Sequence, residues 1–110
     1  MIEPETEHAI RTFLARISGE ADVVDVLLFG SRARHHHRPE SDADVAVLLR
    51  GKHGKRLDAA LRFADAAFDV MLETGILIEA VPLWEDEWAA PETFANPSFI
   101  ANIQREGVRL

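Results

Sequence analysis

The chain has 110 residues, of which 47% are hydrophobic and 28% are charged, and this predicts one domain over residues 1–110 with a modest apolar core. Its net charge of −7 argues against general binding of nucleic acid, because that binding depends on Lys and Arg at the phosphates. It contains no cysteine, no apolar run that could span a bilayer and no apolar signal-peptide core in its acidic N-terminus. We therefore expect no disulfide, no membrane association and a cytoplasmic location.

The first predicted elements are a helix followed by two strands. Apolar residues at helical spacing predict a helix from Pro4 to Ile17, which Gly19 ends. Val23 to Phe29 is a short apolar run typical of a strand buried on both faces, and Asp44 to Leu49 predicts a second strand. Alternation along this second strand predicts one face with Asp42, Asp44, Ala46 and Leu48, and an opposite face with Ala43, Val45, Val47 and Leu49.

The second half of the chain predicts two more helices around a third strand. A helix up to Thr74 is capped by Gly75, and its predicted apolar face consists of Leu57, Leu61, Ala64, Phe68, Met71 and Leu72. Ile76 to Leu83 is the third strand, in which Pro82 indicates an edge position or the end of the strand. A helical turn at Trp84–Trp88 follows.

The last predicted helix begins at Asn96-Pro97 and ends before Gly107, and its apolar face consists of Phe99, Ile100 and Ile103. The order of helices and strands predicts an α/β (α+β) domain in which helices flank a small mixed sheet of three or four strands.

Asp42 and Asp44 form the first candidate site. Two positions apart on a strand, their side chains point to the same face, about 6.5 Å apart at the backbone. Like charges this close repel unless a cation neutralises them, and Mg²⁺ accepts one or two carboxylates together with phosphate oxygens. Two such ions about 4 Å apart would suit an in-line transfer of a phosphoryl-type group. The alternative is an acidic strand end that faces solvent.

Gly30 and Ser31 form the second candidate site. They follow an apolar strand and open a predicted helical turn from Arg32 to His36, where free backbone N–H groups and the positive end of a helix dipole favour an anion. The alternative is an ordinary turn. The combination is more specific, because the turn and the two aspartates lie at the ends of neighbouring apolar strands.

The stretch "LFGSRARHHHRPESDADVAVLL" resembles the signature of the DNA polymerase β-like nucleotidyltransferase superfamily, Gly-Ser-x10-Asp-x-Asp. It is similar in particular to the minimal nucleotidyltransferases, which are stand-alone domains of about this length, and the ending "FIANIQREGVRL" is similar to the tail of many of them. The resemblance implies the polymerase β-like nucleotidyltransferase fold.

The resemblance also implies roles for single residues. It assigns Gly30 and Ser31 to the phosphates of a nucleoside triphosphate, and Asp42 and Asp44 to Mg²⁺, with two ions expected. The implied reaction transfers a nucleoside monophosphate to an acceptor hydroxyl and releases pyrophosphate, as in the EC 2.7.7 class. Active members add a third carboxylate, as metal ligand or general base.

Glu79 is the candidate for that third carboxylate, because it lies on the predicted third strand between Ile78 and Ala80. The alternative is a strand-end Glu in solvent, and many members of the family have the shorter Asp here. Glu73 and Glu85 are poorer candidates, because one lies at a helix end and the other lies beyond the strand.

Arg32 and Arg34 match the family pattern "GSRAR" and are candidates for contact with phosphate or an acidic neighbour, the alternative being exposed, solubilising side chains. His35 departs from the glycine that is usual next. Adjacent histidines cannot all face one metal ion, so we expect His35 to His37 to form an exposed loop. Trp84 and Trp88 are expected in a surface or partner contact rather than in nucleotide stacking.

The leading functional hypothesis is an ATP-dependent protein adenylyltransferase. Proteins of this kind resemble the antitoxin of a two-gene module, which adds AMP to a tyrosine of an all-helical HEPN ribonuclease toxin. The alternative is a non-catalytic antitoxin that neutralises a partner by complex formation, and a nucleotide-binding sensor is a third hypothesis. A homo- or hetero-oligomer is compatible with each of them.

Overall fold

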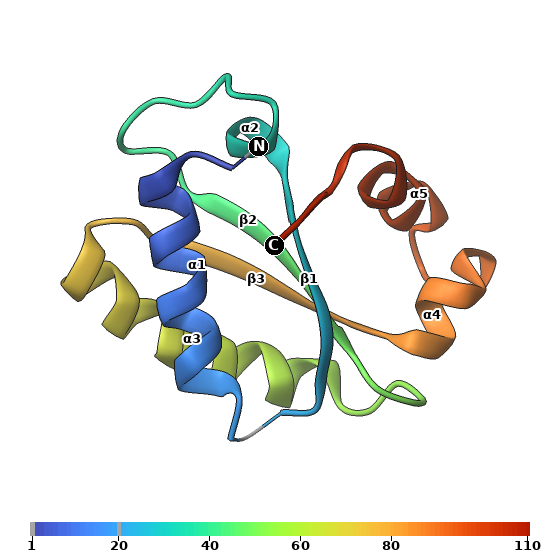
Figure 1. Ribbon diagram of the computed structural model, residues 1–110. Coiled ribbons are helices and arrows are strands. Elements are labelled where there is room, and N and C mark those ends of the chain that lie inside the picture. Colours follow the sequence, from blue (N-terminus) through green and yellow to red (C-terminus); the bar gives the residue numbers. More distant parts are fainter. Residues whose placement is uncertain (1, 20) are drawn as a thin grey trace.

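A four-stranded mixed sheet forms the centre of the computed structural model, which describes residues 2–19 and 21–110 (Figure 1). The elements in chain order are α1 (Pro4–Ile17), β1 (Val23–Phe29), α2 (Gly30–Ala33), β2 (Ala43–Leu49), α3 (Arg56–Thr74), β3 (Ile78–Trp84), α4 (Glu85–Ala89), a 3₁₀ turn (Pro91–Thr93), α5 (Pro97–Glu106) and β4 (Val108–Arg109). The strand order is β3-β2-β1-β4, with β2 parallel to β3 and the other pairs antiparallel. The predicted α/β class with a small mixed sheet is confirmed.

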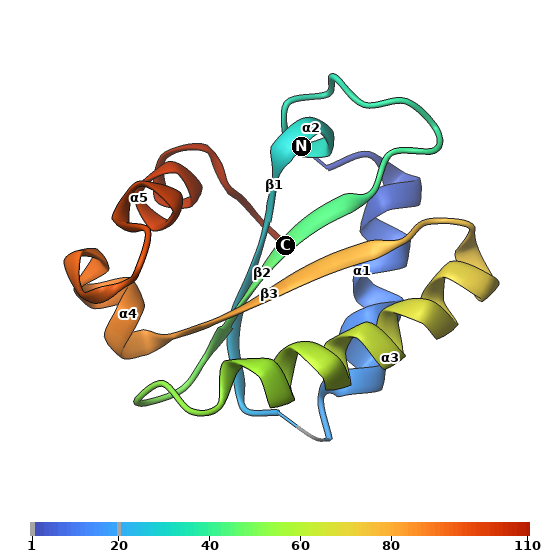
Figure 2. The same cartoon turned by 180° about the vertical axis from the view of Figure 1, so that it is seen from behind.

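The sheet separates two apolar layers, as the alternation along β2 predicts. Helices α1 and α3 pack on one face, where they bury the side chains of Ala43, Val45, Val47 and Leu49. Helix α5 packs on the other face against Ala46 and Leu48. Figure 2 shows the same division from behind, with α1 and α3 on one side of the strands and α4 and α5 on the other.

Helix α3 has the predicted end but buries a different face. Gly75 caps it in the left-handed conformation, with φ of 82°. The side chains that it buries are Ala59, Phe63, Ala67 and Val70, and Phe63 meets Phe13 of α1 edge-on, with ring centroids 6.0 Å apart. The larger side chains of the predicted face point away from the sheet, so this prediction was wrong. Small alanines on the inner side let α3 pack closely against the sheet and α1. This close packing stabilises the fold more than burial of the larger leucines on the other face would.

Strand β3 lies at the edge of the sheet, where Pro82 costs no ladder hydrogen bond. The strand begins at Ile78, two residues later than predicted, and ends at Trp84. The prediction of a surface contact for Trp84 was wrong, because this side chain is only 8% exposed and joins the core beside α3, with the Arg56 guanidinium 5.2 Å from its ring centroid.

The C-terminal segment forms more structure than its pattern predicts. Helix α5 begins at Pro97, ends before Gly107 and buries Ile100 and Ile103, as predicted. Strand β4 is added, because two residues after Gly107 pair with Leu27 and Leu28 of β1. A strand of two residues has no periodicity of its own and depends on the strand beside it. Within the described ranges, every helix is too short or too polar to cross a bilayer.

Candidate active site

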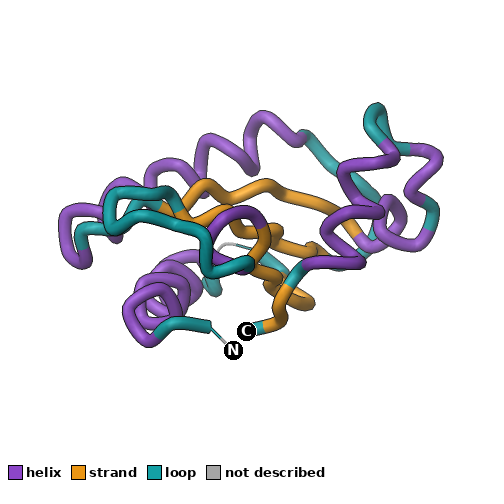
Figure 3. Tube along the Cα trace, turned by 90° about the horizontal axis from the view of Figure 1, so that it is seen from above, coloured by secondary structure: helices purple, strands orange, loops and turns teal. Residues whose placement is uncertain are grey.

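The candidate site residues meet where β1 ends and where β2 and β3 begin. Phe29 pairs with Asp44 between β1 and β2, and Asp44 pairs with Glu79 between β2 and β3. Paired residues of adjacent strands project to the same face, so Asp44 and Glu79 lie side by side, and Gly30 follows directly after Phe29. Seen from above, the loop between α2 and β2 lies at this end of the sheet (Figure 3). The structure therefore brings the predicted third carboxylate next to the first two.

Asp44 and Glu79 share a hydrogen bond that shifts both groups. Partial burial raises the pKa of Asp44, and the charge of Asp42 adds to this, while the hydrogen bond from Glu79 and the charge of Arg34 act against it. The hydrogen bond to Asp44 is the main cause that raises the pKa of Glu79, followed by burial and by the two aspartate charges. The two carboxyl groups lie close enough for each to change the pKa of the other. The site therefore concentrates negative charge.

The carboxylate oxygens of Asp42, Asp44 and Glu79 fit a hard divalent cation, which prefers such ligands and would offset their negative charge. Across residues 2–19 and 21–110, no three His, Asp or Glu side chains already surround a common metal position. Asp42, Asp44 and Glu79 are therefore neighbours that do not form a ready-made coordination shell.

Gly30 makes the close approach between the turn and Asp44 possible. Its φ is 73°, which favours glycine, and a Cβ added there would overlap with the Asp44 carboxylate. The sequence therefore needs glycine at this position for two independent reasons. Helix α2, which Gly30 begins, has only four residues, and Ser31 lies in its first turn, where N–H groups lack intrahelical partners.

His35 occupies the position that ends α2. The His35 N–H donates to Arg32 O at 3.4 Å and the His36 N–H donates to Ser31 O at 2.9 Å, which is the pattern of a Schellman motif. The φ of His35 is 58°, in the left-handed region that favours glycine. His35 thus adopts a left-handed conformation at the position where the family pattern has glycine.

Of the two contacts predicted for Arg32, with phosphate or with an acidic neighbour, the structure contains the second, an ion pair with Glu3. The Arg32 side chain is 2% exposed, and its guanidinium donates to Ser41 O at 2.8 and 3.0 Å and to Pro39 O at 3.1 Å. It also donates to Thr6 Oγ1 at 2.9 Å and pairs with Glu3 at 3.4 Å. These bonds tie the loop that leads into Asp42 to the start of α1. The role of Arg32 is therefore support of the loop.

The sequence analysis did not single out Glu3 and Thr6. They lie 29 and 26 positions before Arg32, and no local pattern relates residues that far apart. The side chain of Thr6 is fully buried on an otherwise amphipathic helix, which is the feature that could have drawn attention to it.

Arg34 remains available to a ligand. Half of its side chain is exposed, and its one ion pair within the described chain is a long contact of 3.8 Å with Glu106. A cavity of about 190 Å³ lies beside it, lined by Phe29, Gly30, Arg34, Phe99, Asn102, Ile103 and Glu106. Arg34 thus presents positive charge beside the Gly30 turn.

The three histidines do not act as a group. His35 and His36 are exposed, as predicted, whereas His37 is mostly buried and its Nε2 lies 3.2 Å from both Glu3 carboxylate oxygens. Its Nδ1 is buried and has no hydrogen-bond partner among the described residues. The exposed-loop prediction was therefore wrong for His37.

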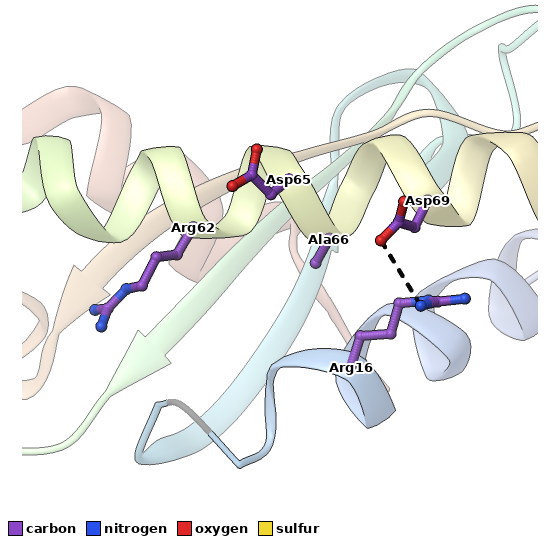
Figure 4. A pocket seen from close by; sticks show the side chains of 5 residues that line it. All are labelled: Arg16, Arg62, Asp65, Ala66 and Asp69. Carbon is purple, nitrogen blue, oxygen red and sulfur yellow. Dashed lines mark ion pairs between the residues drawn. The ribbon is translucent and has the colours of Figure 1, made fainter.

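A further hollow of about 520 Å³ lies between α1 and α3, away from these residues. Figure 4 shows its lining, Arg16, Arg62, Asp65, Ala66 and Asp69, with an ion pair of 3.8 Å between Arg16 and Asp69. None of the candidate site residues lines it. The rejected candidates also lie elsewhere, because Glu73 pairs with Arg16 and Glu85 accepts the Gly51 N–H.

Comparison with known proteins identifies the family of this chain. Residues 14–110 match the family model described as "Polymerase beta, Nucleotidyltransferase". A crystal structure of a Sulfolobus solfataricus protein, described as a candidate nucleotidyltransferase, is similar with 20% identity and a TM-score of 0.47, over 99% of this chain and 87% of that one. A comparison with curated proteins found no match. Because the family model matches most of the chain, the protein belongs to the polymerase β nucleotidyltransferase family.

Proposed function

We propose that the protein transfers AMP from ATP to a hydroxyl group and releases pyrophosphate. The observation that supports this most strongly is the meeting of Asp44 and Glu79, on paired strands, with the Gly30 turn that packs against Asp44. A nucleoside triphosphate and the carboxylates of the site are both negatively charged and repel each other. Binding the triphosphate beside these carboxylates therefore requires cations and N–H donors between them. The turn and Arg34 supply such donors.

In the proposed reaction, the acceptor oxygen bonds to the α-phosphorus while the bond from that phosphorus to the bridging oxygen of the β-phosphate breaks. Gly30, Ser31 and Arg34 hold the phosphate oxygens, and this positions the α-phosphorus. Asp42, Asp44 and Glu79 would hold Mg²⁺, which would neutralise phosphate charge and favour loss of the acceptor's proton. The hydroxyl proton passes to the Glu79 carboxylate, which lies on the strand paired with that of Asp44.

We further propose that the acceptor is a tyrosine of a HEPN-type toxin and that the protein acts as its antitoxin. This rests on the resemblance of "LFGSRARHHHRPESDADVAVLL" to the minimal nucleotidyltransferases. The net charge of −7 also suits a partner with a basic ribonuclease face.

The test is to incubate the protein with ATP labelled on its α-phosphate, Mg²⁺ and the product of the neighbouring gene. We expect label on the partner, released as AMP-tyrosine after digestion. Asp42→Asn with Asp44→Asn should remove the label without changing the fold, because both changes keep the side-chain shape. Asp65→Asn on α3 is the matched control and should keep full labelling. Labelling that survives in the double variant would refute the mechanism.

The same double variant separates the enzyme from the non-catalytic antitoxin. If transfer neutralises the toxin, cells that express the toxin with the double variant stop growing, although the two proteins still co-purify. If covering the partner suffices, the double variant protects the cells as well as the wild type does, and the enzymatic proposal for neutralisation is wrong.

A further inference from the structure

Two of the three candidate metal ligands lie on strands, whereas Asp42 lies just outside the sheet. The pairing of β2 with β1 and β3 holds Asp44 and Glu79 in place. Asp42 precedes the first residue of β2, and the register with either neighbouring strand begins after it. On its C-terminal side, the Ala43 N–H donates to Leu77 O at 2.9 Å. The peptide group on its N-terminal side needs a separate support.

Arg32 provides that support through the carbonyl group of Ser41, the residue directly before Asp42. The Arg32 Nε and Nη2 atoms donate to Ser41 O at 3.0 and 2.8 Å, and Nη2 also donates to Pro39 O at 3.1 Å. Two donors on one carbonyl oxygen restrict both the position and the direction of this peptide group. The backbone at Asp42 is therefore held on one side by the sheet and on the other by the Arg32 guanidinium.

The guanidinium is in turn held by the start of helix α1, which lies beside α2 and the loop after it (Figure 1). Arg32 Nη1 donates to Thr6 Oγ1 at 2.9 Å, and the Thr6 hydroxyl donates to Glu3 Oε1 at 3.1 Å. Arg32 is 2% exposed and Thr6 is fully buried. Removal of the Thr6 hydroxyl would leave Nη1, a buried charged donor, with only its longer contact of 3.4 Å to Glu3. Helix α1 thus acts on the backbone at Asp42 through buried hydrogen bonds.

The Glu3 carboxylate supplies the negative charge of this network. It lies 3.4 Å from Arg32 Nη1, and both of its oxygens lie 3.2 Å from His37 Nε2. Burial acts to raise the pKa of Glu3, but the hydrogen bond from Thr6 and the contacts with His37 and Arg32 outweigh it and lower the pKa. Glu3 is therefore ionised at neutral pH and offsets the charge of the buried guanidinium. Because His37 belongs to the same loop as Ser41, Glu3 holds this loop at two points.

We propose that Glu3 and Thr6 are positioning residues, which act through Arg32 to hold Asp42 in the place from which it binds Mg²⁺. This role rests on the proposed function, because that function takes Asp42 as a ligand of the metal ion. Glu3 and Thr6 act on a ligand and not on the substrate, so their effect is on metal affinity. Partners that orient a metal ligand typically contribute about 10- to 100-fold to metal affinity or activity. Asp44, which the sheet holds, does not depend on them.

The first experiment measures binding of Mn²⁺, as a probe of the Mg²⁺ site, to the full-length protein by electron paramagnetic resonance. Thr6→Val removes the hydroxyl and should raise the dissociation constant of Mn²⁺ at least about tenfold, whereas Thr6→Ser keeps the hydroxyl and should restore most of the affinity. Thr12→Val is the matched control on the same helix, because the Thr12 hydroxyl donates to His8 O within α1. A wild type that binds no Mn²⁺, or a Thr6→Val variant that binds it as tightly as the wild type, would overturn the proposal.

Glu3→Gln gives the same test if Thr6→Val does not fold. It removes the negative charge but leaves Arg32 its Thr6 acceptor, so it should raise the dissociation constant of Mn²⁺ by a smaller factor than Thr6→Val. An unchanged constant in Glu3→Gln would remove Glu3 from the proposed role.

The second experiment separates positioning from a general loss of stability. Ile17→Val, at the other end of α1, removes a buried methyl group and should lower the melting temperature without changing the dissociation constant of Mn²⁺. In Thr6→Val, NMR relaxation should show the order parameter of the Asp42 amide falling from about 0.85 toward about 0.6, while that of Asp44 stays unchanged. Equal losses of Mn²⁺ affinity in the two variants, or equal changes at Asp42 and Asp44, would refute the positioning role.

Failure of the proposed function gives a different result. If Thr6→Val weakens Mn²⁺ binding and loosens Asp42, but the wild type transfers no AMP to its partner, the positioning role holds and the proposed reaction is wrong. If the wild type transfers AMP and Thr6→Val binds Mn²⁺ as the wild type does, the reaction holds and the positioning role is wrong.

Discussion

Two regions of the molecule depart from the usual rule that apolar side chains are buried and charged ones are exposed. The region of α2 and the loop after it buries a charged side chain, whereas helix α3 exposes large apolar ones. Across α2 and this loop, from Gly30 to Asp42, the most buried side chain is a charged one, Arg32 of α2, which is 2% exposed. On α3, four large apolar side chains lie in solvent. The loop carries Asp42 and has no apolar core of its own, so a buried guanidinium with several backbone acceptors orders it. Helix α3 already has a complete inner face, so its outer apolar face remains exposed.

This comparison teaches that burial follows the neighbours a side chain can reach rather than its polarity alone. Arg32 reaches two carbonyl groups and one hydroxyl within hydrogen-bond distance, and these offset its desolvation. Leu61 and Phe68, by contrast, remain 58% and 55% exposed. The predictions below separate the two cases by exchanging one residue in each region at a time.

The largest expected effect contrasts two phenylalanines of α3. Phe63→Ala should reduce the free energy of unfolding by about 3–5 kcal/mol, because it leaves a cavity beside Phe13. Phe68→Ala should change it by no more than about 0.5 kcal/mol, since its ring is on the exposed face of α3. Urea denaturation of the two variants measures both changes. Equal losses would show that both faces of α3 are part of the core.

The next effect contrasts the two arginines of "GSRAR". Arg32→Met should cost about 2–4 kcal/mol, because it leaves the carbonyl groups of Pro39 and Ser41 without donors. Arg34→Met should leave stability nearly unchanged and weaken ATP binding instead. Denaturation and calorimetric titration with ATP and Mg²⁺ measure the two properties. If the Arg32→Met variant is as stable as the wild type, Arg32 does not stabilise the loop, and the proposed difference between the two arginines is wrong.

Gly30→Ala should cost about 1–3 kcal/mol of stability through its positive φ, and about 10²-fold in nucleotidyl transfer through displacement of Asp44. The matched control is Gly19→Ala, where an added Cβ meets nothing within 4 Å. Thermal unfolding and single-turnover transfer report the two effects separately. Full activity in Gly30→Ala would show that the turn does not position Asp44.

His35→Gly should stabilise the protein by about 0.5–1 kcal/mol, because glycine relieves the left-handed strain but adds freedom to the unfolded chain. His36→Gly, one position later, lacks the strain and should destabilise slightly. Comparison of the two denaturation midpoints is sufficient. A loss of stability in His35→Gly would mean that the imidazole makes a compensating contact.

The smallest effect is the pH dependence from the carboxylates, because Asp44 is only partly buried, Glu79 is exposed and solvent screens their interaction. Both pKa values are raised in the folded state, so the folded protein binds more protons than the unfolded chain above roughly pH 4. Stability should therefore fall as pH rises through that window. Asp44→Asn with Glu79→Gln should flatten this fall between pH 4 and pH 7, as followed by thermal unfolding. An unchanged slope would place its cause elsewhere.

Local chemistry in the sequence determined most elements and the core of the site. Pro4, Gly75 and Asn96-Pro97 mark helix ends through backbone preferences that hold in any context, and alternation along β2 assigns each residue to a face. The spacing of Gly30-Ser31 and Asp42-x-Asp44 likewise places a turn and a carboxylate pair at the ends of adjacent strands. These features depend only on residues a few positions apart.

Tertiary structure alone decided which groups meet. The parallel register of β2 and β3 sets Glu79 beside Asp44, β1 turns Val108–Arg109 into a strand, and α1 supplies Thr6 to bury Arg32. The buried face of α3 was also undecided by its pattern, since the helix has apolar residues on two sides. The physical reason is the same in each case: desolvation and hydrogen bonding depend on neighbours that are distant in the chain, and periodicity carries no information about them.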